Sequence, residues 1–140
     1  SLGASKAEDF EIPMRLANST SQLTNLELKV LSNIDKESER RLGSTKCEQC
    51  RECMPCPSEI PIPDILRLRN IAIGNGQIEF AKERYNLIGR AGHWWESKNG
   101  NDCNGCNFCI SKCPHNLNIP KLLSETHKML EDKPKRRLWG

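Results

Sequence analysis

Eight cysteines are the clearest candidate ligands and reactive side chains of this chain. They fall into two runs of four, and each run is followed directly by proline. The first run is Cys47, Cys50, Cys53 and Cys56, and the second is Cys103, Cys106, Cys109 and Cys113. Thiolates at such short spacings are typical ligands of zinc ions and of iron–sulfur clusters. The two runs therefore predict two metal sites.

The second run has the spacing C-x2-C-x2-C-x3-C-P, which is the 4Fe–4S run of bacterial-type ferredoxins. Three cysteines separated by two residues each let a tight loop wrap one cubane. The fourth cysteine lies beyond that loop, and in two-cluster ferredoxins it binds the other cluster. The same logic predicts crossed ligation here. One cluster is assigned to Cys47, Cys50, Cys53 and Cys113, and the other to Cys103, Cys106, Cys109 and Cys56.

Two alternatives stay open at the level of sequence. The first run is one residue shorter before Cys56, which would also allow this cysteine to bind the metal of its own run. Two zinc ions, each held by four thiolates, are the main rival cofactor, because C-x2-C pairs suit tetrahedral zinc. Zinc ribbons, however, usually contain two isolated pairs of cysteines. Disulfide bonds between the cysteines are a further alternative, but they would need an oxidising compartment. The spacing therefore favours two 4Fe–4S clusters.

An internal repeat extends beyond the cysteines. The segment CPSEIPIPDIL (56–66) aligns without a gap with CPHNLNIPKLL (113–123), which indicates a duplicated unit. In each copy a second proline, Pro63 or Pro120, is expected near a helix start, where its missing N–H is harmless. Apolar residues then follow at helical spacing, and these are Ile62, Ile65, Leu66, Ile119, Leu122 and Leu123.

Helical periodicity predicts helices near 21–34, 62–72, 77–88 and 119–131, around two cluster-binding loops at 47–57 and 103–114. A cap is expected at Ser19 to Ser21, and Gly43 is expected to stop the first helix. No alternating pattern of a strand is apparent. The predicted class is all-α. The predicted order is a flexible lead-in and N-terminal helix (1–42), a dicluster domain (43–131) and a basic tail (132–140).

Composition limits what this domain can be. The chain has 140 residues, of which 36% are hydrophobic, with only three Trp, one Tyr and three Phe, so bound metal is expected to help hold a thin core. The net charge is +3 with scattered basic residues, which does not favour nucleic acid as a partner. No apolar run approaches the ~20 residues of a membrane span, and residues 1–10 lack the pattern of a secretion signal. A cytoplasmic location is therefore expected.

The segments around the cysteines resemble a known family. CRECMPCPSEIPIPDILRLRN (50–70) and CNGCNFCISKCPHNLNIPKLLSETHKML (103–130) are similar to the C-terminal ferredoxin-like region of certain aldo/keto reductase family oxidoreductases. IPMRLANSTSQLTN (12–25) also resembles the end of that family's barrel and the helix after it. The resemblance implies an α-helical ferredoxin-like domain, with residues 1–42 as the linker from a catalytic domain. The family's Asp-Tyr-Lys-His active site and nicotinamide pocket are not in this sequence.

The expected function is that of an electron-transfer module that serves a larger reductase. Its expected partners are a catalytic reductase domain on the same polypeptide and a redox donor or acceptor. The chain itself is interpreted as non-catalytic, because every cysteine serves as a ligand and no acid–base–nucleophile set is apparent. The alternative is a structural or interaction module, stapled by zinc or clusters, without a redox role. His115 is interpreted as a surface residue, and no partner is identified for His127.

Overall fold

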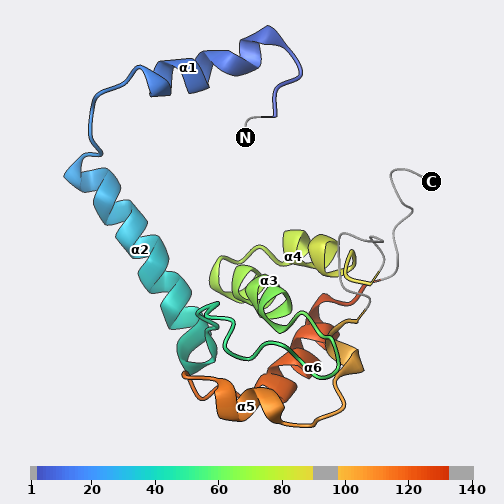
Figure 1. The fold of residues 1–140 in the computed structure, drawn as a ribbon. Coiled ribbons are helices and arrows are strands. Elements are labelled where there is room, and N and C mark those ends of the chain that lie inside the picture. Colours follow the sequence, from blue (N-terminus) through green and yellow to red (C-terminus); the bar gives the residue numbers. More distant parts are fainter. Residues whose placement is uncertain (1–2, 90–97, 133–140) are drawn as a thin grey trace. The chain divides into compact units, whose positions relative to one another are not determined.

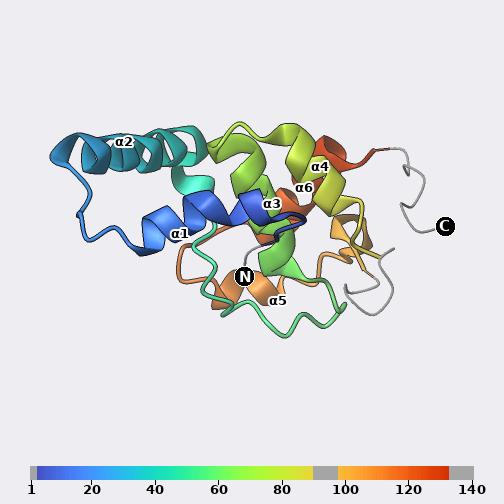
Figure 2. The ribbon, with the colours of Figure 1, turned by 90° about the horizontal axis from the view of Figure 1, so that it is seen from above.

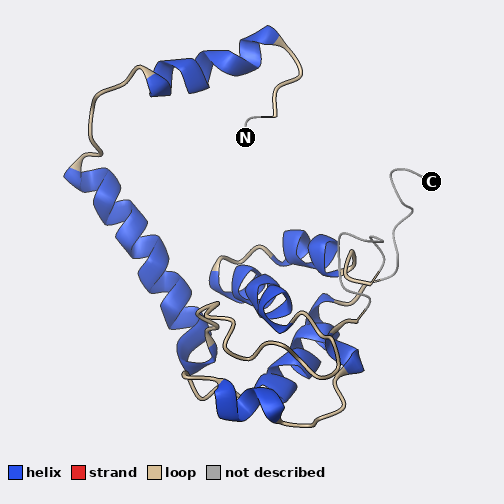
Figure 3. Cartoon of the chain, in the orientation of Figure 1, coloured by secondary structure: helices blue, strands red, loops and turns tan. Residues whose placement is uncertain are grey.

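The computed structural model describes residues 3–89 and 98–132. Every regular element within these ranges is a helix, which confirms the predicted all-α class (Figure 3). Two compact units make up the chain, Ser1–Ser32 and Asn33–Gly140. Within the described ranges, no helix is both long and apolar enough to cross a lipid bilayer. Apart from residue 132, the predicted basic tail lies outside the described residues.

The first unit is more helical than the sequence predicted. The part of residues 1–42 before the predicted helix, expected as a flexible lead-in, contains the 3-10 helix η1 (Ala7–Phe10) and α1 (Glu11–Ala17). The long helix α2 (Asn25–Leu42) begins later than the predicted residue 21, and the predicted cap at Ser19 to Ser21 is wrong. Thr24 caps α2 instead. Its backbone N–H donates to Glu27 Oε2 at 2.7 Å, and the Glu27 N–H donates to Thr24 Oγ1 at 3.3 Å.

The second half of α2 belongs to the second unit and extends beyond the predicted end at residue 34. Its charged stretch stays helical because neighbouring turns pair with each other. Glu37 forms ion pairs with Arg40 at 2.7 Å and with Arg41 at 2.8 Å. Gly43 then ends the helix with a left-handed backbone (φ 52°), as the sequence predicted.

Three helices form the core of the second unit. Helices α3 (Ile62–Gly74), α4 (Ile78–Tyr85) and α6 (Ile119–Leu130) pack on one another, and α6 also contacts the short turn η4 (Gly100–Asp102) (Figures 1 and 2). A further short helix, α5 (Phe108–Lys112), lies inside the segment expected to be the second loop. The most buried apolar side chains of the core are Ile60, Ile62, Ile65, Leu66, Ala81, Tyr85, Ile88, Leu117, Ile119, Leu122, Leu123 and Leu130. The apolar positions of the sequence repeat therefore supply much of this core.

The sequence repeat is also a repeat of the backbone. Pro63 and Pro120 both lie in the first turn of their helices, as predicted. Glu59 (φ 57°) and Asn116 (φ 54°) are both left-handed at matching places before those helices. The same backbone hydrogen bonds recur around the two helix starts. The two copies therefore share one local fold, which runs from the last cysteine of each run into α3 or α6.

Helix α4 ends at Tyr85, short of the predicted residue 88. The side chain of the next residue explains this end. Asn86 Nδ2 donates to the Lys82 carbonyl at 2.8 Å and to the Leu130 carbonyl at 3.1 Å. A side-chain amide that takes up backbone acceptors competes with further helical turns. Asn86 therefore ends α4 and joins it to the end of α6.

Candidate metal centre

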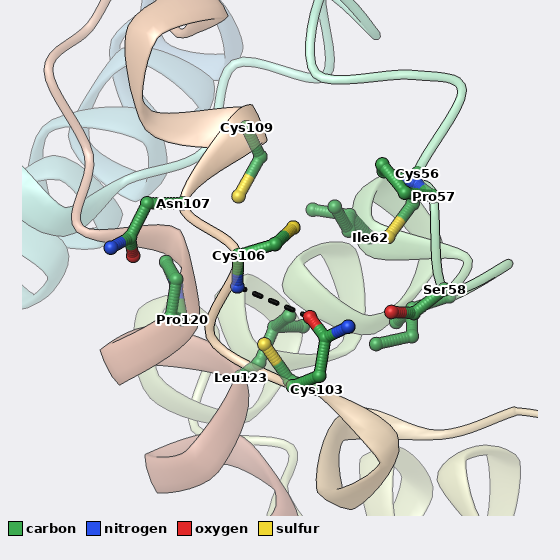
Figure 4. Close-up of a pocket in the computed structure, with 12 residues that line it drawn as sticks. Cys56, Pro57, Ser58, Ile62, Cys103, Cys106, Asn107, Cys109, Pro120 and Leu123 are labelled. Atoms are coloured by element: carbon green, nitrogen blue, oxygen red, sulfur yellow. Dashed lines mark hydrogen bonds between the residues drawn. The ribbon is translucent and has the colours of Figure 1, made fainter.

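One group of four cysteines borders a common pocket. Cys103, Cys106 and Cys109 come from the second run, and Cys56 comes from the first. Figure 4 shows their four sulfur atoms facing the space between the two chain segments. Most of the remaining lining is apolar or comes from proline, with Ile60, Ile62, Leu123, Pro57 and Pro120. We call this group the second site.

The thiols of the other four cysteines interact electrostatically with one another. Burial raises the pKa of the Cys47 thiol, and interactions with Cys50 and Cys113 raise it further. Cys53 likewise interacts with Cys47 and Cys50. The structure therefore brings Cys113 near the first loop, although Cys113 follows the second run in sequence. We call Cys47, Cys50, Cys53 and Cys113 the first site.

The two sites are neighbours in the structure. Cys53 of the first site and Cys109 of the second are each 7% exposed, and they interact electrostatically. Burial is the main cause that raises the pKa of both thiols to about 11. Metal binds to the thiolate, so these inner thiols must release their protons when a metal enters.

The two loops curl in the same way. Gln49 and Gly105 are left-handed between the first and second cysteines, and Arg51 and Asn107 are left-handed directly after the second. Alternating right- and left-handed residues form concave nests of backbone N–H groups, which bind anions and occur at many iron–sulfur sites. From the third cysteine of each run the loops differ, because in the second run a helix, α5, includes this cysteine.

Side chains of α3 hold the first loop. Asn70 Nδ2 donates to the Cys47 carbonyl at 2.7 Å, and the Cys47 N–H donates to Asn70 Oδ1 at 3.4 Å. Arg69 donates to the Thr45 carbonyl at 3.2 Å and to its hydroxyl at 3.0 Å. Gln49 Nε2 donates to Cys47 Sγ at 3.3 Å. The sequence analysis missed Arg69 and Asn70, although a polar pair within the apolar stretch ILRLRNIAI marks them.

A chain of hydrogen bonds holds the segment before the second loop. The Gly100 N–H donates to the Tyr85 hydroxyl at 3.1 Å, and this hydroxyl lies 2.7 Å from His127 Nδ1. Burial raises the pKa of Tyr85 to about 12, so the phenol keeps its proton at neutral pH and can donate it to His127. His127 Nε2 lies 3.2 Å from Glu131 Oε2. His127, for which the sequence offered no partner, thus fastens the second loop through Tyr85.

Gly100 lies where the structure leaves no room for a side chain. A Cβ on this residue would lie 2.7 Å from the Leu123 carbonyl oxygen and 3.1 Å from the Tyr85 hydroxyl. The turn η4 therefore lies directly against α6. His127 on α6 and Asn70 on α3 occupy equivalent positions of the repeat, so each helix secures the start of its own loop.

His115 is exposed, as the sequence analysis expected. It borders a separate hollow together with Lys46, Glu39 and Glu48, beside the turn after α2. Lys46 pairs there with Glu39 at 3.5 Å and with Glu48 at 3.2 Å. None of the cysteines lines this hollow.

The donor chemistry of both sites suits metal. Each site offers four thiols, a donor set that both cubane clusters and zinc use. The lining of the second site is otherwise largely apolar. Within the described residues, no three His, Cys, Asp or Glu side chains lie in the arrangement that a single metal ion needs. The chain matches no family model, no curated protein and no solved structure.

Proposed function

We propose that residues 43–131 form an α-helical ferredoxin-like electron-transfer module that binds two 4Fe–4S clusters with crossed ligands. The observation that carries the proposal is the position of Cys56, which borders one pocket with Cys103, Cys106 and Cys109. This is the arrangement expected when the last cysteine of each run binds the cluster of the other. The matching left-handed positions of the two loops support it.

The side chains of the chain would hold and shield the clusters. Four thiolates bind each one, and the apolar residues around the second site limit contact with water, which helps to set a reduction potential. A bound 4Fe–4S cluster accepts and releases one electron at a time. The interaction of Cys53 with Cys109 makes the two sites close neighbours, so electrons would pass over a short path.

The resemblance of residues 12–130 supports a wider proposal. The module serves as the C-terminal part of a cytoplasmic oxidoreductase of the aldo/keto reductase kind, with residues 1–42 as the linker. Its partners are then the catalytic reductase domain and an external one-electron donor or acceptor. The substrate chemistry belongs to that catalytic domain, and the present chain supplies or removes electrons.

Metal analysis of anaerobically purified protein tests the proposal. We expect about eight iron and about eight acid-labile sulfide per chain, with a brown colour that bleaches when a one-electron reductant is added. A colourless protein with two zinc ions per chain would overturn the proposal in favour of a zinc-stapled structural module. Iron-loaded protein that no reductant bleaches would indicate clusters with a structural role only.

A further inference from the structure

Arg69 is a buried cation that the proposed ligand sets do not use. Only 7% of this residue is exposed, and its guanidinium donates to the carbonyl and hydroxyl of Thr45, both neutral groups. Among the described residues, no ion pair includes Arg69. Burial lowers its pKa and the charge of Glu125 on α6 acts in the opposite direction, but an arginine keeps its proton in proteins.

The guanidinium of Arg69 is hydrogen-bonded to the segment that leads into the first loop. Thr45, which accepts both of its hydrogen bonds, is two residues before Cys47. The neighbouring Asn70 holds the backbone of Cys47 itself. Glu125 acts on Arg69 but forms no ion pair with it. A buried cation without an ion pair is costly, and a further nearby anion would offset that cost. A cubane bound by four thiolates carries a net charge of about −2 and would be such an anion.

The repeat places no cation at the position of the second copy that is equivalent to Arg69. Thr126 occupies the position equivalent to Arg69, just as His127 is equivalent to Asn70. Thr126 is fully buried, and its hydroxyl donates to the Leu122 carbonyl at 2.6 Å. The two copies therefore share a backbone but differ by one buried charge.

We propose that Arg69 raises the reduction potential of a cluster in the first site above that of a cluster in the second. This inference rests on the proposed function. Reduction adds one negative charge to a cluster, and a buried cation nearby stabilises the more negative state in a medium of low dielectric constant. One electron shared by the two clusters would then reside mainly in the first site, which gives the module a direction of transfer.

Redox titration of the anaerobic protein, followed by electron paramagnetic resonance, tests the proposal with Arg69→Gln. We expect the wild-type clusters to differ in potential. Arg69→Gln should lower one of them, changing the equilibrium constant for electron distribution between the clusters at least tenfold, or about 59 mV for a one-electron couple.

Arg67→Gln, on the exposed side of the same helix, is the matched control and should change the constant much less. Arg69→Lys should keep most of the difference. An iron-loaded Arg69→Gln protein with unchanged potentials, or with both potentials shifted equally, would overturn the proposal.

A measurement on the wild-type protein covers the case in which Arg69→Gln fails to fold. In the half-reduced protein, hyperfine-shifted β-proton signals in nuclear magnetic resonance identify the cysteines around the reduced cluster. We expect them to belong to Cys47, Cys50, Cys53 and Cys113. Signals from the cysteines of the second site would refute the role of Arg69. Absence of iron and sulfide from the wild-type chain would instead refute the proposed function itself.

Discussion

At the scale of single residues, the two loops share one backbone although their side chains differ. Gln49, Arg51, Asn107 and Gly105 take left-handed conformations at matching places, and only one of them is glycine. A residue with a Cβ loses roughly 1–2 kcal/mol in this conformation, so the loops keep it against a local preference. The curl that brings three cysteines around one site explains why they do.

Gly105→Ala tests the need for this curl. The new Cβ would meet no atom within 4 Å, so its effect is conformational and not steric. Because Gly105 has a φ of 71°, we expect a loss of about 1 kcal/mol of stability and a lower unfolding temperature in anaerobic thermal unfolding. Gly3→Ala, also in open space but without a left-handed φ, should change nothing. Equal unfolding temperatures for the two variants would contradict this explanation.

Crossed ligation makes a sharper prediction. In a background with Cys103, Cys106 and Cys109 all replaced by alanine, only the first site can hold a cluster, so about four iron per chain should remain. Adding Cys113→Ala should then lower the iron content, because Cys113 is the proposed fourth ligand of that site. Adding Cys56→Ala should leave it unchanged. The reverse pattern would show that each run binds its own metal.

At the scale of elements, α3 and α6 do the same work with different side chains. Asn70 on α3 bonds directly to the backbone of Cys47, whereas His127 on α6 reaches Gly100 through Tyr85. The link through Tyr85 is possible because α4 packs against α6 and places the ring of Tyr85 beside that of His127. Each loop is therefore fixed near its start, the first at Cys47 itself and the second at Gly100, before its first cysteine.

Tyr85→Phe tests the longer of these two links. The ring stays in the core, but the Gly100 N–H loses its acceptor and Nδ1 of His127 loses its partner, while Nε2 keeps Glu131. An unsatisfied buried donor costs about 1–3 kcal/mol, so we expect lower stability and faster hydrogen exchange at the Gly100 amide. The Cys47 amide, held by Asn70, serves as the internal control and should exchange as before. Unchanged exchange at Gly100 would show that Tyr85 does not fix the turn.

At the scale of the whole molecule, the second unit combines a small helical core with two facing loops. Only 36% of the residues of the whole chain are hydrophobic. The core of the second unit consists largely of two copies of one short apolar pattern. Cys56 and Cys113 each lie with the loop of the other copy. Clusters bound in this way would tie the copies together and add the free energy of metal binding to that of folding.

Removal of the metal tests this coupling. After iron is stripped by a chelator under oxidising conditions and the thiols are reduced again, we expect the metal-free chain to unfold at a markedly lower temperature. The helical circular dichroism should fall with it, because the crossed thiolates no longer join the copies. Reconstitution with iron and sulfide should restore the original transition. A metal-free chain that unfolds at the original temperature would mean that the core alone holds the fold.

Features that depend on local pattern could be predicted from the amino-acid sequence. Helical periodicity predicted the all-α class and the places of α3, α4 and α6, because burying one face of a helix requires apolar residues at that spacing. The repeat predicted two copies with proline in the first helical turn, and Gly43 marked the end of α2. The sequence analysis did not predict the short helices α1 and α5 or the late start of α2, because brief helices and single caps leave weak patterns in a sequence.

Contacts between groups far apart in the chain could be identified from the folded structure alone. Spacing assigned the cysteines to two sets but left Cys56 open, and the fold places it beside the second loop because α3 and α6 pack together. The same packing joins Gly100 to His127 through Tyr85 and buries Arg69 at the start of the first loop. These contacts join residues far apart in sequence, so no local pattern encodes them. They depend on how the helices pack, which the sum of many weak side-chain contacts decides.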